Sequence, residues 1–140
     1  MLSKTMVCIA ATALSLTGSM VAAQSAGEKE FKNACAVCHG LDGTGNGPLS
    51  SLMNTAAPDL TQLTVKADGV YPMLHVVHVI DGRTGIGAHG SAAPDWAGGM
   101  PVWGDRFKAQ AGEEYGTYGA ELFVRGRVMA LADYLETIQK

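Results

Sequence analysis

Two cysteines separated by two residues, with a histidine directly after the second, constrain this chain more than any other feature. The stretch is Cys35-Ala-Val-Cys38-His39, and CxxCH is the spacing at which c-type haem is attached. Each thiol can add to one vinyl group of the porphyrin, and the histidine is then held under the iron as its proximal ligand. The motif therefore predicts one covalently bound haem c per chain, held by Cys35, Cys38 and His39.

Two other uses of a CxxC pair fit the sequence less well. A redox-active pair of the thioredoxin type belongs in a βαβ pattern, which this chain lacks. A zinc site needs two further ligands at matching spacing, and the chain has neither a second CxxC nor an HxxxH. Both alternatives are therefore disfavoured.

The N-terminus has the layout of a secretory signal peptide. Lys4 precedes an apolar run over residues 6–16, and the small residues Val21-Ala-Ala23 provide a cleavage site before Gln24. The apolar run is short for a spanning helix, so an uncleaved membrane anchor is the weaker alternative. We expect residues 1–23 to be removed together with Cys8, leaving one domain over residues 24–140. Haem attachment outside the cytoplasm agrees with this leader and predicts a periplasmic protein.

The charge of the predicted mature chain points to protein partners. Without Lys4, nine basic and 13 acidic side chains remain, a net charge of −4. An acidic surface disfavours nucleic acid and anionic membranes as partners, and it favours a redox partner with a basic docking patch. The sequence does not identify the donor or the acceptor.

Hydrophobic periodicity predicts a mainly helical, all-α fold. Ser25 and Glu28 have the spacing of a capping box, which would open a first helix that runs into CxxCH and ends at Gly40. Phe31, Ala34 and Cys35 share one face of this helix. The glycine-rich residues 42–48 predict a tight turn, because the lysine of a phosphate-binding loop is missing.

The second half of the chain predicts two more helices separated by a loop. Residues 71–80 form a short apolar helix that ends at Asp81-Gly82, and the glycine-rich residues 82–99 form a long surface loop. A last helix spans about residues 120–139, with Gly126 as a weak point. Its predicted apolar stripe consists of Leu122, Val128, Leu131, Leu135 and Ile138.

A six-coordinate haem needs a second axial ligand, and Met100 is the strongest candidate. It opens Met100-Pro101-Val102-Trp103-Gly104 after two glycines, so proline stiffens the backbone beside the sulfur. Met129 is interpreted as core filler. The remaining candidates, which leave bis-histidine ligation or another methionine open, are Met53, Met73, His75, His78 and His89.

Other side chains have possible roles beside the cofactor. Trp103 is interpreted as packing, whereas nothing decides the role of Trp96. The arginines are expected to lie on a solvated face, with Arg83 and Arg106 the better candidates for binding haem propionates; the other two are Arg125 and Arg127.

Together, these motifs resemble a class I monohaem cytochrome c of the bacterial periplasmic type, over residues 25–139. The likeness rests on the early CxxCH, on Met-Pro-Val-Trp-Gly 61 residues after His39, and on an aromatic-bearing last helix. It implies that the first and last helices cross at Phe31 and Tyr134, and that Pro48 offers its carbonyl to His39. It also implies that residues 58–60 pack on the haem edge. Residues 82–99 and 110–119 depart from the compact family pattern.

The resemblance implies an electron carrier rather than an enzyme, with His39 and Met100 as the iron ligands. A haem c subunit of a periplasmic dehydrogenase or oxidase complex is the main alternative. A sensor or enzyme with an open distal site is a third, and it would require that Met100 not bind the iron. Fold alone does not choose among these pathways.

Overall fold

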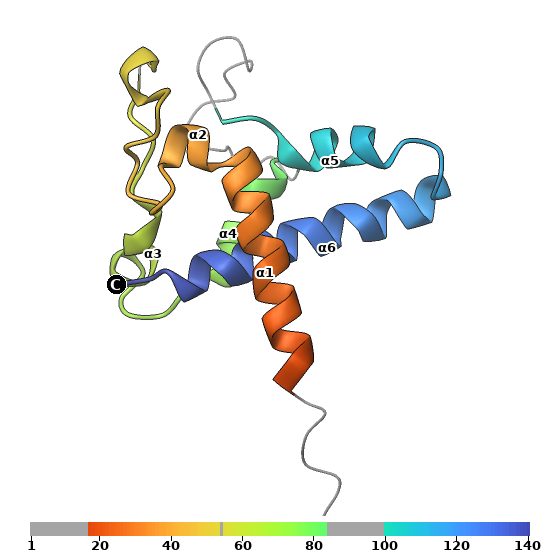
Figure 1. Cartoon of the computed structure of the whole chain (residues 1–140), viewed down its shortest axis with the longest axis horizontal. Helices are drawn as coiled ribbons and strands as arrows, with labels where there is room; N and C mark the ends of the chain where they lie inside the picture. The colour runs from red at the N-terminus through yellow and green to blue at the C-terminus, as the bar shows by residue number, and fades with distance from the viewer. Residues whose placement is uncertain (1–16, 54, 84–99) are drawn as a thin grey trace, which may run out of the picture.

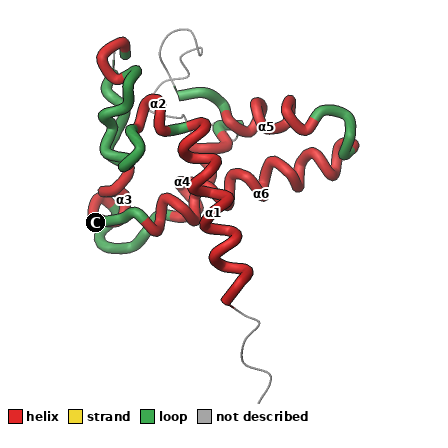
Figure 2. Tube along the Cα trace, in the orientation of Figure 1, coloured by secondary structure: helices red, strands yellow, loops and turns green. Residues whose placement is uncertain are grey.

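The computed structural model describes residues 17–53, 55–83 and 100–140, and every regular element in these ranges is a helix (Figures 1 and 2). The all-α prediction is confirmed. The apolar run of the leader with Cys8, His89, Trp96 and most of the predicted 82–99 loop lie outside the described residues.

Two helices from opposite ends of the chain cross at the centre of the fold. They are α1, Thr17–Ala34, and α6, Gly116–Thr137 (Figure 1). Phe31 is fully buried at the crossing, and its ring centroid lies 5.3 Å from that of Tyr134, which confirms the predicted pair. A Cβ added to Gly27 would overlap the carbonyl oxygen of Ala130. The backbones therefore meet at a distance that only glycine allows at this position.

The first helix begins earlier than predicted. Ser25 lies inside α1, which starts at Thr17, so the capping box predicted from Ser25 and Glu28 does not open this helix. The small residues that precede Ser25 contain no proline, and they continue the helical backbone through the predicted cleavage site.

Part of the predicted stripe on α6 is wrong. Val128, Leu131 and Leu135 are buried as predicted, but Leu122 is 69% exposed and Val124 is fully buried in its place. Leu122 lies six residues before Val128, which turns it about 120° away on a helix of 3.6 residues per turn. The sequence spacing therefore favoured Val124, four residues before Val128.

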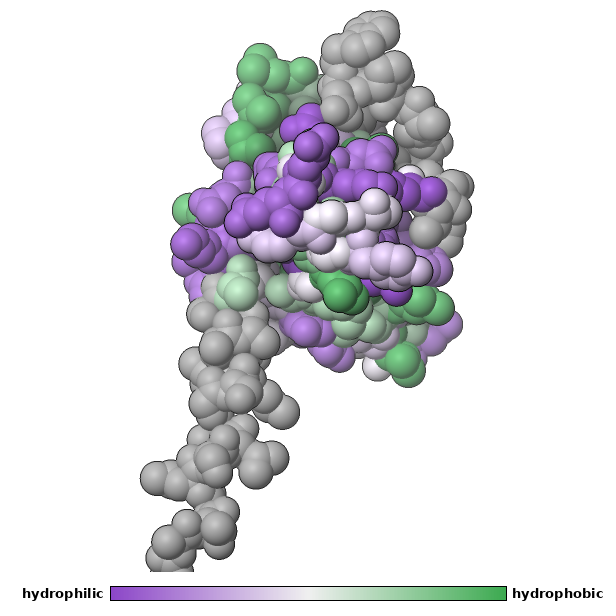
Figure 3. All heavy atoms as spheres, turned by 90° about the vertical axis from the view of Figure 1, so that its right-hand side faces the viewer, coloured by the Kyte–Doolittle hydropathy of each residue, from purple (hydrophilic) through white to green (hydrophobic). Residues whose placement is uncertain are grey.

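Met129 also lies on the outer face of α6, with 42% of its surface exposed, so its interpretation as core filler is wrong. Tyr118 is exposed on this helix as well. At the end of the molecule where α5 and α6 join, apolar groups interrupt a mainly hydrophilic surface (Figure 3).

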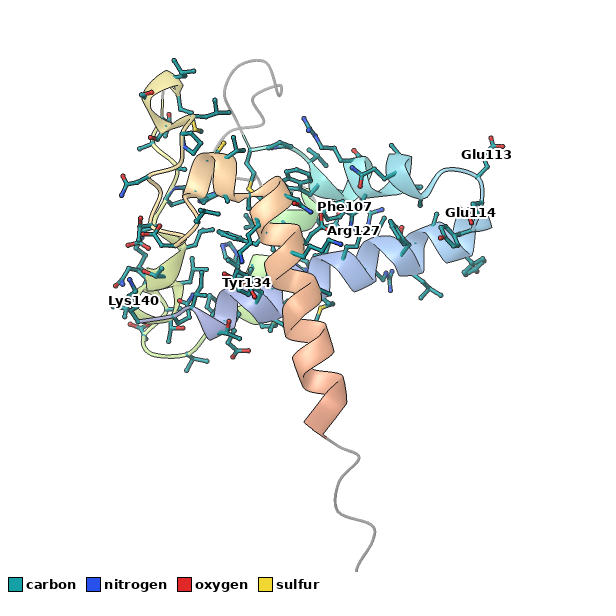
Figure 4. All side chains as sticks on the ribbon, viewed as in Figure 1. Phe107, Glu113, Glu114, Arg127, Tyr134 and Lys140 are labelled. Atoms are coloured by element: carbon teal, nitrogen blue, oxygen red, sulfur yellow. The ribbon has the colours of Figure 1, made fainter. Side chains whose placement is uncertain are left out.

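Helix α5, Trp103–Ala111, was missed in the sequence. Trp103, Phe107 and Ala111 recur every four residues, and this spacing could have revealed it. The guanidinium of Arg127 lies 3.9 Å from the centroid of the Phe107 ring, and the two side chains face each other between α5 and α6 (Figure 4). Arg127 also donates to Glu30 of α1 at 2.9 Å, so it joins three helices.

The helix predicted over residues 71–80 is present as α4, Met73–Asp81. It ends at Gly82, whose left-handed backbone (φ 71°) returns its N–H to the His78 carbonyl. Val76 and Ile80 are buried. Just before this helix, the Tyr71 hydroxyl donates to the Ala132 carbonyl at 2.8 Å, so α4 is tied to α6.

The C-terminus closes over a short helical segment made of η2, Leu60–Gln62, and α3, Leu63–Lys66. The Gln139 side chain accepts from the Thr64 N–H at 2.9 Å and donates to the Leu60 carbonyl at 2.8 Å. These bonds attach the end of α6 to the segment that follows residue 58.

The crossing predicts opposite effects at two helical glycines. Gly27→Ala should lower the free energy of unfolding by about 2–3 kcal/mol, because the new methyl group overlaps the α6 backbone. Gly126→Ala should raise it by up to about 1 kcal/mol, because the added methyl group would meet no atom beyond its own stretch of helix and alanine favours the helix. Thermal unfolding of the two variants measures both effects. Equal destabilisation by both would contradict a close crossing at Gly27.

Candidate haem-attachment site

The CxxCH stretch forms a separate helical turn after α1. Helix α2, Ala36–His39, is separated from α1 by a break at the turn residue Cys35, whose φ of −107° departs from the usual helical value. The N–H groups of Cys38 and His39 both donate to the Cys35 carbonyl, at 3.1 and 2.9 Å. Because residues three apart share a helix face, Cys35 and Cys38 lie on the same side of this turn. Sequence reasoning predicted that the first helix would reach CxxCH, but it missed the break.

The tight turn predicted over residues 42–48 is present, and together with its flanking residues it covers the end of α2. Gly45 donates to the His39 carbonyl at 2.8 Å, Gly47 to Cys38 at 3.1 Å and Leu49 to Val37 at 3.0 Å. These bonds satisfy carbonyl groups that a helix end leaves without partners. A Cβ on Gly47 would come within 2.5–2.7 Å of the α2 backbone, so a side chain there would push the loop off the motif.

His39 is buried, with 6% of its surface exposed, and its orientation is fixed by the Pro58 carbonyl. The Nδ1–H donates to that oxygen at 3.1 Å, which leaves the lone pair of the neutral ring on Nε2. Burial lowers the pKa of His39, and the hydrogen bond to Pro58 opposes this shift in part. The side chain is therefore held as a neutral imidazole, the form that binds iron.

The prediction that Pro48 supplies this carbonyl is wrong, because Pro58 does. Residues 57–60 are brought onto the glycine loop by the Leu60 N–H, which donates to the Gly43 carbonyl at 2.8 Å. Gly45, with φ 91°, packs so closely on the Ala57 carbonyl that a Cβ would overlap it. Asp59 then caps η2 by accepting from the Thr61 N–H at 2.8 Å. Only these long-range contacts distinguish the two prolines.

The two cysteines are free thiols that lie partly buried. Burial raises the pKa of Cys35 to about 12, and the nearby Glu30 and Cys38 add to the shift. A thiol with this pKa stays protonated at neutral pH, whereas redox-active CxxC pairs lower the pKa of a reactive cysteine. The electrostatics therefore do not favour a thioredoxin-like pair.

Among the candidates for the second axial ligand, Met100 and Met73 pack against the apolar core that Cys35 also borders. Met53 ends η1, Ser50–Leu52, and is partly buried. Met129 and His75 are exposed, whereas His78 is partly buried on α4. Met100 therefore stays a candidate for the second axial ligand. Met73 is a better candidate than the sequence indicated, where the lack of a surrounding glycine loop disfavoured it.

The predicted role of Trp103 is confirmed, since it packs against the core with its ring centroid 5.4 Å from that of Phe107. The Arg106 guanidinium lies 5.3 Å from the Trp103 ring. Arg125 is solvated as expected, with 71% of its side chain exposed, but Arg127, at 22%, is not.

Arg83 is also not on a solvated face. It pairs with Asp81 at 2.6 Å and with Glu121 of α6 at 2.9 Å. Hydrogen bonds from Arg83 lower the pKa of both carboxyl groups. Its donors are thus turned toward carboxylates of the chain itself, which does not favour the predicted role as a propionate donor.

These residues fit a covalent haem: two thiols on one helical turn, an oriented neutral imidazole and a bordering apolar core. The cytochrome c family model matches residues 24–138. The chain belongs to the cytochrome c family. It is thus a haem-binding electron-transfer protein, and its cofactor is covalently attached haem c. No significant match was found among curated proteins or among solved structures. Within the described residues, no helix is long and apolar enough to cross a membrane.

The close packing of the glycine loop predicts the effect of Gly47→Ala. The added methyl group should displace the loop from α2 and destabilise the holoprotein by about 1–3 kcal/mol. Asn46→Ala is the control, because Asn46 is exposed and bonds only locally to Thr44 among the contacts described. Thermal unfolding and the yield of haem-loaded protein measure the effect. A Gly47→Ala protein as stable as the control would contradict the described loop packing.

Proposed function

We propose that this cytochrome c is a periplasmic electron carrier whose single haem is attached through Cys35 and Cys38 and ligated by His39 and Met100. One observation carries the proposal: a buried His39, oriented by Pro58, adjoins two thiols on one helical turn. Met100 packs against the core that Cys35 borders, so the segment that follows residue 99 can supply the sixth ligand.

Each residue has a distinct part in this assignment. The Cys35 and Cys38 thiols bond the porphyrin, and the Pro58 carbonyl keeps His39 in the orientation and tautomer that a ligand needs. Bound there, haem c supplies a one-electron iron couple. The apolar side chains of α4 and α5 would exclude water from the haem. The thioether of Met100, as a ligand, would favour the reduced state of the iron.

The ligand assignment predicts a spectroscopic difference between two methionine variants. The ferric protein should show a near-red sulfur-to-iron charge-transfer band, and Met100→Leu should abolish it while keeping apolar volume. Met129→Leu should leave the band intact, because Met129 lies exposed on α6.

The same spectra distinguish the alternatives. Loss of the band in Met73→Leu, with Met100→Leu unaffected, would reassign the ligand to the other methionine that borders the core. A ferric protein with no such band would contradict methionine ligation and favour His75, His78, His89 or an open distal site.

Export should remove residues 1–23. The helix contacts that hold α1 to α6, at Gly27 and Phe31, both lie after this site, so cleavage leaves the crossing intact. The family match also begins at residue 24. Mass spectrometry of protein from the periplasm should give a chain that starts at Gln24 and carries the mass of one haem. A chain that retains Lys4 would contradict the proposed processing.

Purification from native cells tests the carrier against the subunit alternative. A carrier should elute near the mass of the single mature chain, because interfaces between redox partners are small and transient. Stable co-elution with a dehydrogenase or oxidase would favour the haem c subunit instead.

A further inference from the structure

We propose that Arg83 is a positioning residue for Met100, acting by fixing the segment that carries this methionine to helices α4 and α6. The inference rests on the proposed ligation of haem iron by Met100. It concerns how the second ligand is held, because Met100 lies 61 residues after His39 and belongs to a different part of the fold.

Arg83 joins two carboxylates from different parts of the chain. Its Nε and one Nη donate to Asp81 at 2.6 and 2.8 Å, and both Nη atoms donate to Glu121 at 2.9 and 3.1 Å. Such bidentate ion pairs fix the relative orientation of the two groups and are stronger than single hydrogen bonds. The side chains are mostly shielded, with exposures of 21% for Arg83 and 14% for Asp81. The end of α4 is thereby fixed to α6.

This ion cluster lies directly on the start of α5. A Cβ added to Gly104 would overlap the Asp81 carboxylate and the Arg83 Nε. Beside it, a Cβ on Gly82 would lie 3.2 Å from the nearest methyl carbon of Val102. Residues 81–83 therefore form a platform for the backbone of residues 102–104, and Arg83 ties that platform to α6.

The platform restricts Met100 through a stiff connection. Only Pro101 separates Met100 from the supported Val102. Proline fixes its own φ, and it also confines the preceding residue to extended conformations. Because Val102 is held, few backbone conformations remain open to Met100. The position of its thioether sulfur is therefore restricted.

The experiment measures how readily an added ligand replaces Met100 on the ferric iron. Imidazole binds only molecules in which the methionine has left, so its apparent affinity reports the population of that state. Arg83→Gln should raise imidazole affinity about tenfold and weaken the near-red band. Arg83→Lys keeps the charge but cannot form both bidentate ion pairs, so it should also raise the affinity for imidazole, by several-fold.

Two control variants separate positioning from charge and from general stability. Arg125→Gln removes a charge next to the same Glu121 at 3.3 Å, but it is an exposed side chain from within α6. Arg127→Gln breaks a pair of similar burial, with Glu30, away from residues 81–83. Arg125→Gln should keep imidazole affinity within about twofold of the unaltered protein. Arg127→Gln should lower the melting temperature but raise the affinity less than Arg83→Gln does, because it leaves the contacts of residues 81–83 with residues 102–104 in place.

The outcomes are decisive. Unchanged imidazole affinity in Arg83→Gln, or full recovery in Arg83→Lys, would overturn the positioning role. If Arg83→Gln yields no folded holoprotein, Glu121→Gln decides: a several-fold rise in affinity supports the proposal and an unchanged value overturns it. Absence of the near-red band in the unaltered protein is a different failure, since it would remove Met100 ligation and the inference with it.

Discussion

The crossing of α1 and α6 is the contact on which the other elements depend. It brings α1 and α6 together at Gly27 and Ala130, where the backbones touch, and it buries Phe31 completely. Helices α4 and α5 then pack on the same α6. Because the CxxCH turn directly follows α1, fixing α1 also fixes the thiols and His39 relative to the helices that surround them.

Polar contacts fix how the helices and side chains around this small core are oriented. Arg127 lies against Phe107 and pairs with Glu30, so one guanidinium orders α1, α5 and α6 together. The C-terminal Gln139 binds the segment around Leu60, which is the same segment that presents Pro58 to His39. The orientation of the imidazole thus depends on the last residues of the chain, although the histidine itself lies near the start of the domain.

The sequence predicted the local features well and the long-range ones less well. The cofactor follows from the spacing of five residues, and α4 with its end at Gly82 follows from apolar periodicity and one glycine. One error arose where the outcome depends on distant contacts. Pro48 and Pro58 are equally plausible until the loop is folded back at Gly43. The other two errors concern local patterns: the spacing from Val128 favours Val124 over Leu122, and the recurrence of Trp103, Phe107 and Ala111 every four residues indicates α5.

The same division between local and distant contacts applies to the two proposed iron ligands, His39 and Met100. Cys35, Cys38 and His39 lie within five residues, so a single helical turn and its glycine loop set their arrangement. Met100 comes from a different part of the chain, and covalent attachment of the haem does nothing to hold it. Its position must come from tertiary contacts: Met100 packs against the apolar core, and the residues that follow it, Val102 and Gly104, lie against residues 81–83. In the proposed site, local geometry fixes His39, whereas tertiary contacts position Met100, so substitutions in residues 81–83 should affect the proposed sixth ligand without disturbing haem attachment.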